Sequence, residues 1–380
     1  MPAPLVLVNA IHSKTGGGRV YLEEVVPRVA RLAGARYVVL ARGTQAPRLR
    51  ELGAETHVVS APDNPAGAFA WDQTVLVALA WRLAADLVFT PANFGPIALG
   101  RRSLLLLRNT FEAAESWPGL RARIRWRAME FFSRASVRAA KGALVVSDSF
   151  RSEVARRFCV PADSLCVVHH GRSDRFRPNP DPKDAAIAPR DRYVVVVGDI
   201  YPHKNLETVI DAFARLAPRH ADLALVFAGA EVDEAYAARM RGRAADLGLA
   251  RRVTFAGPRS QTELPAFYRR AVCALSLSLA ETFGITQVEA LACGTPLVAS
   301  DIAVTREISG DAAVLVPPRD PDAVAAAVER VLTDSAWRAE LGRRAILRAA
   351  AFTWDRTAAR LHEEVLRRIS DLAPGAIGIQ

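Results

Sequence analysis

Residues 276–300 read SLSLAETFGITQVEALACGTPLVAS, and this stretch indicates how the chain folds. An apolar run of strand type ends near Ser278, a turn containing Gly284 follows, and a helical pattern begins near Ile285. A second apolar run at 296–299 completes a strand–helix–strand unit. Because such a unit joins neighbouring parallel strands, the stretch predicts an α/β fold with a parallel sheet.

The same alternation of strands and helices extends along the chain. Strands that are apolar throughout and separated by helical patterns are typical of a parallel sheet buried on both faces. We expect two doubly wound, Rossmann-like domains that bind ligands at the carboxyl ends of their strands. The predicted strands are 5–9, 37–40, 57–60, 87–90, 104–107, 144–147 and 167–169, followed by 193–198, 223–228, 253–257, 273–278, 296–299 and 313–316.

Composition places the boundary between the two domains. The segment 175–192, RFRPNPDPKDAAIAPRDR, is rich in proline and charge and has no periodic pattern, so we expect the linker at 179–192. The first domain then covers 1–178 and the second covers 193–352, while helical patterns dominate the chain from 353 to 380.

The bulk composition predicts a folded protein of the cytoplasm. Of the 380 residues, 51% are apolar, and no run approaches the roughly 18 apolar residues of a membrane-spanning helix. The N terminus lacks the layout of a signal peptide. The four cysteines show neither metal-binding nor disulfide spacing, and no H-E-x-x-H or DxD-like motif suggests a metal ion.

The excess of positive over negative charge lies in the first half of the chain. Residues 1–180 contain 25 Lys/Arg and 14 Asp/Glu, so 25 − 14 = +11, whereas residues 181–380 contain 25 and 26, so 25 − 26 = −1. This asymmetry predicts an anionic partner for the first half. Nucleic acid is disfavoured, because aromatic residues are not interleaved as stacking platforms.

The most basic stretch, GLRARIRWRAMEFFSRASVRAAKG, begins at Gly119 and ends at Gly142. A basic amphipathic helix with aromatic residues suits the anionic inner face of a membrane. The alternative is a helix whose apolar stripe packs against the first sheet and whose charges face solvent. The apolar residues at near-helical spacing are Leu120, Ile124, Phe131, Phe132 and Ala135.

Two carboxylates, Glu281 and Glu289, stand on either side of the glycine turn described first. The start of a helix offers backbone N–H groups and a positive dipole to a phosphate, and Gly284 allows close approach. Carboxylates that read hydroxyls on both sides of a diphosphate suit a nucleotide sugar. Taken alone, the same pair also fits a helix N terminus and a solvated helix residue.

Two further segments carry groups suited to phosphate. The block VVVVGDIYPHKNLETVIDAFARL places Lys204 in the loop after the first strand of the second domain, where a point charge suits a diphosphate. Its neighbour His203 is more typical of a surface position. The segment SKTGGGRVYLEEV places Gly16 and Gly17 after the first strand, without the G-x-G-x-x-G spacing of a dinucleotide-binding enzyme.

Together these blocks resemble the retaining glycosyltransferases of family 4, also called glycosyl transferases group 1. The resemblance implies a GT-B fold, in which two Rossmann-like domains face each other across a cleft, and a C-terminal helix that crosses back to the first domain. It also implies a nucleotide-sugar donor, no obligatory metal and no other cofactor. The donor-binding positions that match are Gly16, Gly17, Lys204, Glu281, Phe283, Gly284, Ile285, Thr286 and Glu289.

The resemblance assigns catalysis to Lys204 and Glu281 and points to a third residue. Many members of the family place a histidine near the transferred sugar, where this chain has LLLLRNTFEAAES; Asn109 is the candidate for that place. Asn109 also fits a residue that merely ends a strand. Asp199 stands where many members carry an arginine.

The expected function is therefore retaining transfer of a hexose in the synthesis of a bacterial surface polysaccharide or glycolipid. The block KNLETVIDAF favours mannosyl- or rhamnosyl-type members, and the acceptor is a saccharide or a lipid-linked saccharide. Two alternatives stay open: a nucleotide-sugar epimerase of GT-B fold, and a non-catalytic anion-binding protein.

Overall fold

The computed structural model describes most of the chain, and internal packing divides it into two units. The residues described are 3–14, 16–111, 120–189 and 192–372. Of these, 172–189 and 192–352 form the second unit, and the others form the first. The parts of the sequence predictions that fall at Gly119, 190–191 and 373–380 lie outside the described residues.

The described strands of the first unit form a seven-stranded sheet with the order β3-β2-β1-β4-β5-β6-β7. Every neighbouring pair is parallel, and the order changes direction between β1 and β4. The strands expected in this half are confirmed, with ends that differ by at most two residues. They are β1 (Leu5–Asn9), β2 (Arg36–Ala41), β3 (Thr56–Val58), β4 (Leu87–Thr90), β5 (Ser103–Leu107), β6 (Ala143–Val145) and β7 (Leu165–Val167).

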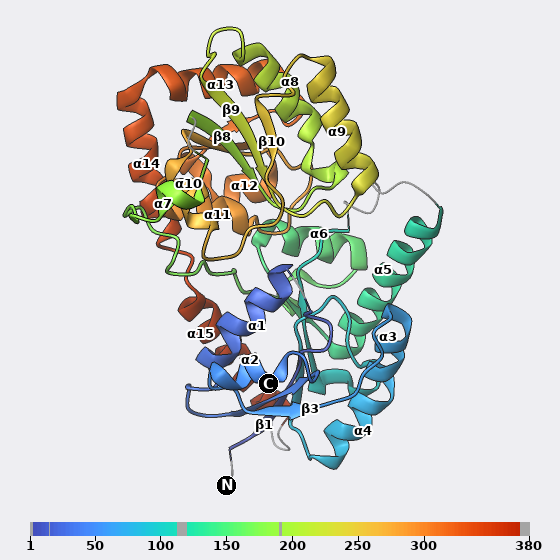
Figure 1. Cartoon of the computed structure of the whole chain (residues 1–380). Coiled ribbons are helices and arrows are strands. Elements are labelled where there is room, and N and C mark those ends of the chain that lie inside the picture. Colours follow the sequence, from blue (N-terminus) through green and yellow to red (C-terminus); the bar gives the residue numbers. More distant parts are fainter. Residues whose placement is uncertain (1–2, 15, 112–119, 190–191, 373–380) are drawn as a thin grey trace. The chain divides into compact units, whose positions relative to one another are not determined.

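Helices connect these strands. Side chains of α3 and α4, among them Trp71 and Leu76, pack with Leu7 and Val88 of the sheet. Helices α1 and α15 lie side by side (Figure 1). The helices are α1 (Gly16–Val29), α2 (Ala46–Glu51), α3 (Pro65–Gln73), α4 (Val75–Arg82), η1 (Ile97–Arg102), α5 (Leu120–Ala140), α6 (Asp148–Phe158), η3 (Ala162–Ser164) and α15 (Trp354–Leu372).

Helix α15 is part of the first unit although it follows the second unit in sequence. The Thr353 hydroxyl accepts a hydrogen bond of 3.3 Å from the Arg356 N–H at its start, as expected of a capping residue. Trp354 is buried, with its ring 6.0 Å from that of Tyr21 in α1. Further along, the Tyr37 hydroxyl lies 2.7 Å from Nδ1 of His362.

The described strands of the second unit form a six-stranded parallel sheet with the order β10-β9-β8-β11-β12-β13. Its order changes direction between β8 and β11. The strands predicted for this half are confirmed to within two residues. They are β8 (Arg192–Val197), β9 (Leu223–Ala228), β10 (Val253–Phe255), β11 (Cys273–Ser276), β12 (Leu297–Ser300) and β13 (Val314–Val316).

Helices cover both faces of the second sheet. Successive residues of a strand point to opposite faces, so neighbouring residues of β8 show which helices lie on each side. Val194 packs with residues of α8, α9 and α13, whereas Val195 packs with residues of α10, α11 and α14. The helices are α7 (Asp184–Ile187), η4 (Pro202–Lys204), α8 (Leu206–Leu216), α9 (Glu234–Asp246), α10 (Leu264–Arg270), α11 (Ile285–Ala292), α12 (Ala303–Ile308), η5 (Gly310–Ala312), α13 (Pro321–Thr333) and α14 (Ser335–Ala349).

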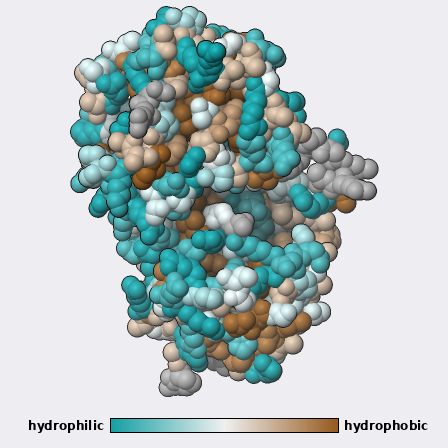
Figure 2. All heavy atoms as spheres, viewed as in Figure 1, coloured by the Kyte–Doolittle hydropathy of each residue, from teal (hydrophilic) through white to brown (hydrophobic). Residues whose placement is uncertain are grey.

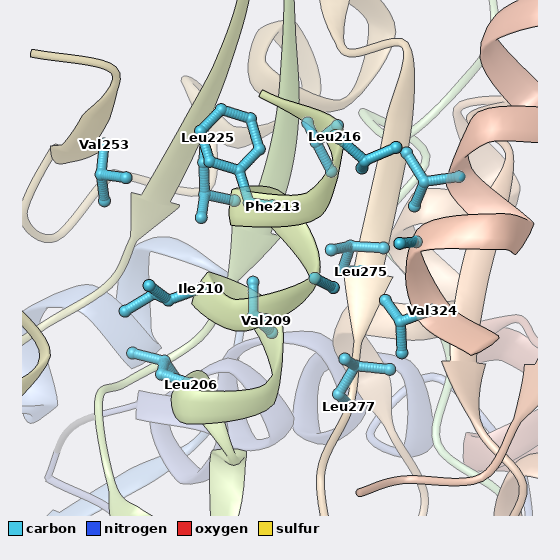
Figure 3. Close-up of a cluster of buried hydrophobic side chains, with 14 of the residues drawn as sticks. Leu206, Val209, Ile210, Phe213, Leu216, Leu225, Val253, Leu275, Leu277 and Val324 are labelled. Carbon is cyan, nitrogen blue, oxygen red and sulfur yellow. The ribbon is translucent and has the colours of Figure 1, made fainter. Parts of the chain in front are cut away.

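Helix α8 shows how the sequence builds this core. Its apolar residues recur three or four positions apart and all face the sheet and α13 (Figure 3). Burying a side chain of this size contributes about 1.5–3 kcal/mol. The α8 residues in the cluster include Leu206, Val209, Ile210, Phe213 and Leu216.

The short helix α7 lies within the segment 175–192, for which the sequence predicts no regular element. A helix of four residues is too short to show a period. Tertiary contacts hold it: Nε of Arg269 donates to Asp184 over 2.6 Å, and both side chains are almost fully buried.

Candidate active site

A charged pair lies where the second sheet reverses its strand order. Lys204 is in η4, which follows β8, and Glu281 follows β11. Nζ of Lys204 lies 2.5 Å from Oε1 of Glu281, and the Ser278 hydroxyl donates to the same oxygen over 2.9 Å. Burial acts to raise the pKa of Glu281, but the Lys204 ammonium outweighs burial and lowers it, so the carboxylate is ionised.

Asn205 holds the loop that carries Lys204. Its φ of 58° lies in the left-handed region, which lets the chain turn sharply from η4 into α8. The side-chain N–H of Asn205 donates to the backbone oxygen of Leu277 over 3.1 Å, and its side-chain oxygen accepts from the Thr208 hydroxyl over 2.8 Å. Since Leu277 directly follows β11, these bonds tie the loop of Lys204 to the loop of Glu281.

His203 is half-buried, whereas the sequence favours a surface position. Its ring stacks on that of Tyr201 with centroids 5.3 Å apart, and its backbone oxygen accepts from the Leu279 N–H over 2.8 Å. Burial, and then the neighbouring Lys204 charge, lower the pKa of His203 to about 4. The imidazole is therefore neutral at physiological pH and adds no charge to the site.

The glycine turn presents the N terminus of α11 three residues after Glu281. Gly284 has a φ of 85°, which favours glycine, and no side chain in the described part of the chain caps the helix. The N–H groups of Ile285 and Thr286 therefore remain available for an anion. Phe283 anchors the turn, because its buried ring lies 5.5 Å from that of Phe352.

Gln287 supports the turn from inside the unit. Its side-chain N–H donates to the Ser276 hydroxyl over 3.2 Å, and its side-chain oxygen accepts from the Ser309 hydroxyl over 3.0 Å. A Cβ atom at Gly284 would lie 2.9 Å from the amide carbon of Gln287. Glycine is thus required at 284 both for its backbone angle and for this close approach.

Glu289 lies one helical turn inside α11 and is only 4% exposed. It is therefore not the solvated helix residue that the isolated sequence pair also allows. Burial raises the pKa of Glu289 to about 8, although a hydrogen bond with the Gln261 side chain acts in the opposite direction. At neutral pH a large fraction of this carboxyl group is protonated, so it can donate as well as accept hydrogen bonds.

The first unit carries the other predicted positions, beginning with the glycine turn after β1. Gly16 starts α1 with a φ of 56°, and Gly17 is exposed beside it. Gly18 is buried, because the Arg108 guanidinium lies where its Cβ would be. Nη2 of Arg108 also donates to the Ser13 hydroxyl over 3.2 Å, so the loops after β1 and β5 are joined.

Asn109 is exposed at the carboxyl end of β5. Its backbone is held by the buried Asn93, whose side-chain oxygen accepts from the Asn109 N–H over 3.2 Å and from the Arg108 N–H over 3.0 Å. The side chain of Asn93 thereby fixes the loop, and the Asn109 side chain forms no hydrogen bond with the described residues.

Three residues of the first unit that the sequence analysis does not select form a buried network. Nε2 of His12 lies 2.6 Å from Oδ2 of Asp72, and the Asn9 side chain donates to Oδ1 of Asp72 over 2.8 Å. One signal was available in the sequence: Asp72 is the single acid in the apolar helical stretch GAFAWDQTVLVALAW.

The predicted site residues divide between the units. Gly16, Gly17 and Asn109 lie in the first unit, and the remainder lie in the second. Within the second unit Lys204 and Glu281 are in contact, while no hydrogen bond or ion pair joins Glu281 to Glu289 among the described residues.

Helix α5 contains the described part of the basic stretch, and its apolar residues do not all face the core. Ile124 is 57% exposed and Phe131 is 65% exposed, with exposed arginines between them. The opposite side packs inward, since the Phe132 ring lies 4.2 Å from that of Phe69 and the Ser136 hydroxyl donates to the Gly95 oxygen over 3.1 Å. The expectation that the whole apolar stripe of this helix packs against the first sheet is therefore wrong.

A second apolar patch lies over α4, where the brown side chains gather on the first unit in Figure 2. Val75 and Trp81 of α4 are exposed, and the Arg102 guanidinium lies 4.9 Å from the centre of the Trp81 ring. Across the described part of the chain, no helix combines the length and apolar character needed to cross a bilayer.

Comparison with known families covers most of the chain. Residues 179–348 match the family described as Glycosyl transferases group 1, and residues 15–175 match the family described as Glycosyltransferase Family 4.

Individual relatives are more distant. O-antigen chain mannosyltransferase B of Escherichia coli is 28% identical over 240 residues, which are 61% of this chain and 62% of that protein. D-inositol 3-phosphate glycosyltransferase 2 of Catenulispora acidiphila is 32% identical over 254 residues, which are 62% and 58% of the two chains. The chain thus spans less than two thirds of the length of these relatives.

Solved structures show the same fold. A sucrose-phosphate synthase from Thermosynechococcus elongatus superposes with a TM-score of 0.78 at 21% identity, covering 97% of this chain and 100% of that one. The Anabaena protein HepE, solved with UDP-glucose, gives 0.77 at 19% identity, covering 95% and 99%. These likenesses, together with the two parallel sheets, confirm the expected α/β fold of GT-B type.

Proposed function

The chain belongs to the group 1 glycosyltransferases of family 4, and from this membership we propose that it transfers a hexosyl group from a nucleotide-sugar donor to an acceptor hydroxyl, with retention of the anomeric configuration. The observation that supports the proposal most directly is the Lys204–Glu281 pair next to the uncapped start of α11. A cation, a carboxylate and available helix amides match the charges and hydroxyls of a sugar diphosphate.

In the proposed mechanism the donor diphosphate lies against Lys204 and the N–H groups of Ile285 and Thr286. When the bond between the anomeric carbon and the diphosphate oxygen breaks, negative charge grows on that oxygen. The ammonium and the positive end of α11 then stabilise the transition state more than the ground state. Glu281, whose partner Lys204 now faces phosphate, accepts hydrogen bonds from hydroxyl groups of the transferred sugar.

Glu289 is proposed to bind hydroxyl groups elsewhere on the donor. Its carboxyl group lies one turn into the helix and is enclosed by the unit. Its hydrogen bonds would therefore strengthen binding of the donor without acting on the bond between the anomeric carbon and the diphosphate. Loss of Glu289 should therefore raise the KM for the donor more than it lowers kcat.

We favour a mannosyl- or rhamnosyl-type donor and a saccharide or lipid-linked saccharide acceptor, in the synthesis of a bacterial surface polysaccharide or glycolipid. The name of the Escherichia coli relative supports a mannosyl donor. No metal or additional cofactor is proposed to take part, because Lys204 and the helix start can supply the positive charge.

The exposed face of α5 supports a site of action at the cytoplasmic surface of a membrane. Ile124 and Phe131 lie seven residues apart, which is two helical turns, and arginines flank them. Apolar side chains at the centre of a basic surface can enter the headgroup region while the arginines contact anionic lipids. The apolar patch on α4 lies in the same unit.

The test is a thermal-shift panel with GDP, UDP, dTDP and ADP and their sugars, with EDTA present, followed by transfer assays with the nucleotide sugar that stabilises most. A ligand at about 100 times its Kd should stabilise the protein by about 2.7 kcal/mol. We expect stabilisation by one nucleotide class, most strongly GDP or dTDP, and loss of this effect in Glu289→Ala.

Other outcomes would identify the alternatives. Conversion of the nucleotide sugar to its epimer without an acceptor would indicate an epimerase. Binding of anionic lipid without a response to any nucleotide would indicate a non-catalytic anion-binding protein. Activity that EDTA abolishes and magnesium restores would show that a metal ion takes part.

A further inference from the structure

A cationic cavity lies in the first unit, where η1, the end of α5 and the end of α15 meet. Its volume is about 100 Å³, and its basic lining residues are Arg101, Lys141, Arg367 and Arg368. Among the described residues, Asp371 is the only carboxylate that lines it. Because η1 precedes β5 and Lys141 precedes β6, the cavity lies at the amino-terminal edge of the sheet, away from the glycine turn after β1.

Arg368 is the buried member of this group and is only 7% exposed. Its Nε donates to Glu364 over 3.1 Å, and its Nη1 donates to the backbone oxygen of Ala140 over 3.0 Å. Nη2 forms no hydrogen bond with the described residues. A Cβ atom at Gly142 would lie 2.7 Å from this Nη2, so glycine leaves room for it. The fold thus holds the guanidinium in place and leaves one nitrogen to donate to a ligand.

Arg101 and Lys141 bring charges that no described carboxylate balances. Both side chains are exposed and form neither a hydrogen bond nor an ion pair with the described residues. Arg367, in contrast, lies 2.7 Å from Glu364 and 2.7 Å from Asp371. Four basic side chains against these two carboxylates leave 4 − 2 = +2. A phosphate monoester carries about 1.5 to 2 negative charges at neutral pH and matches this excess.

The next residue of η1, Arg102, connects the cavity to an exposed tryptophan. Its guanidinium lies 4.9 Å from the centre of the Trp81 ring, and Trp81 is 59% exposed. A tryptophan beside a guanidinium suits the headgroup region of a membrane, where the ring enters the interface and the charge contacts phosphate. Helix α5, whose exposed face is proposed to contact the membrane, ends directly before Lys141.

We propose that this cavity binds the phosphate group of an anionic lipid, with Trp81 in the headgroup region beside it. The phosphate oxygens accept hydrogen bonds from Nη2 of Arg368 and from the side chains of Arg101 and Lys141. A terminal phosphate monoester suits the cavity better than a diester, because a diester has one charge fewer and carries a further group on one oxygen. This inference rests on the proposed action at a membrane surface and names the lipid chemistry that the surface recognises.

The first experiment compares two anionic lipids in vesicles of phosphatidylcholine. One mixture contains phosphatidic acid, whose phosphate is a monoester, and the other contains phosphatidylglycerol, whose phosphate is a diester. The two mixtures are matched in surface charge by their zeta potential, so that general attraction to anionic lipids is equal. In sedimentation assays the wild type should bind the phosphatidic acid vesicles at least about tenfold more tightly.

Variants test which residues cause this preference. The double substitution Arg101→Gln and Lys141→Gln should abolish it, because the excess positive charge of the cavity is lost. The matched control, Arg31→Gln with Arg156→Gln, removes two exposed arginines of the first unit outside the cavity and should keep the preference. Trp81→Ser should weaken binding to both kinds of vesicle and leave the preference unchanged.

A soluble probe distinguishes a lipid from a free phosphate. Glycerol 3-phosphate presents the same monoester without a membrane. It should compete with phosphatidic acid vesicles only at concentrations far above that of the lipid, because it lacks the contact of Trp81 with the bilayer. Competition at the lipid concentration itself, together with unchanged vesicle binding by Trp81→Ser, would make the ligand a free phosphate and overturn the lipid assignment.

The other outcomes separate this inference from the proposed function. Equal binding of the two vesicle mixtures by the wild type would overturn the role of the cavity and leave action at a membrane in place. Equal loss of the preference in both double variants would also overturn it, since total charge alone would then decide binding. If no vesicle is bound, both this inference and the membrane location are wrong, whereas glycosyl transfer is decided by the nucleotide-sugar assays alone.

Discussion

Lys204 and Glu281, 77 positions apart in the chain, form an ion pair that is mostly removed from water. The Lys204 ammonium lowers the pKa of Glu281 and so keeps the carboxylate ionised in a place where an isolated charge would be unfavourable. A donor diphosphate would compete with Glu281 for the ammonium, and sugar hydroxyls would replace the ammonium at Glu281. On the proposed function, the pair is a prepared site whose two charges would separate when the donor binds.

Replacing Lys204 by alanine should lower kcat by about 100- to 1000-fold, because the charge that stabilises the leaving diphosphate is lost. Glu281→Ala should likewise remove most transfer activity, and both variants should remain folded by circular dichroism. Lys183→Ala, which removes an exposed lysine of the second unit, is the matched control. Full activity in Lys204→Ala or Glu281→Ala would show that the site is elsewhere.

Glu289 should make the stability of the protein depend on pH. Its pKa is about 8 in the folded protein and about 4.5 in the unfolded chain, so the folded state binds more protons between these values. The free energy of unfolding should therefore fall as pH rises through this window, by at most about 1.4 kcal/mol per pH unit. Glu289→Gln should flatten this slope, as measured by denaturant unfolding at pH 5, 6, 7 and 8.

Gly284→Ala should destabilise the protein and weaken nucleotide binding together. The left-handed backbone angle costs an L-residue about 1–2 kcal/mol, and the new methyl group would displace Gln287. Gly310→Ala is a matched control, since Gly310 also has a positive φ but no atom lies within 4 Å of the place that its methyl group would take. Equal nucleotide affinity in the two variants would contradict the role of the turn.

The exposed apolar residues of α5 should determine binding to membranes. The double substitution Ile124→Ser and Phe131→Ser should weaken binding to vesicles of phosphatidylglycerol and phosphatidylcholine at least about tenfold, because both side chains lose their apolar contact with the bilayer. Leu347→Ser, which removes a 63% exposed apolar residue of the second unit, should leave binding unchanged. Vesicle sedimentation measures both, and equal effects would contradict the assignment to α5.

The strands and the fold class could be predicted because continuous apolar runs between turn residues fit few other structures. The turn at Gly284 was also readable, since a glycine before an apolar helix restricts the backbone to a few conformations. The contact between Lys204 and Glu281 could not be predicted from the local sequence around either residue. It depends on β8 and β11 being neighbours, which is a property of the strand order.

His12 was missed for the same reason. Asp72 lies 60 positions away. It is the single acid of an apolar helical stretch, but nothing in the local sequence identifies His12 as its partner. The face of α5 that is buried could not be predicted from the sequence either, because Ile124, Phe131 and Phe132 span more than one helical face. Only the position of α3, through Phe69, decides which of them is covered.

Because helix α15 belongs to the first unit, that unit is formed from stretches that are far apart in the sequence. A fragment ending at residue 171 would lack the helix that covers Tyr21 and Tyr37, and would expose apolar surface that the intact chain buries. The described residues of the second unit, in contrast, all lie between 172 and 352. A shortened chain that keeps the first unit intact therefore needs residues 353–372 supplied as a separate peptide or fused ahead of Leu5.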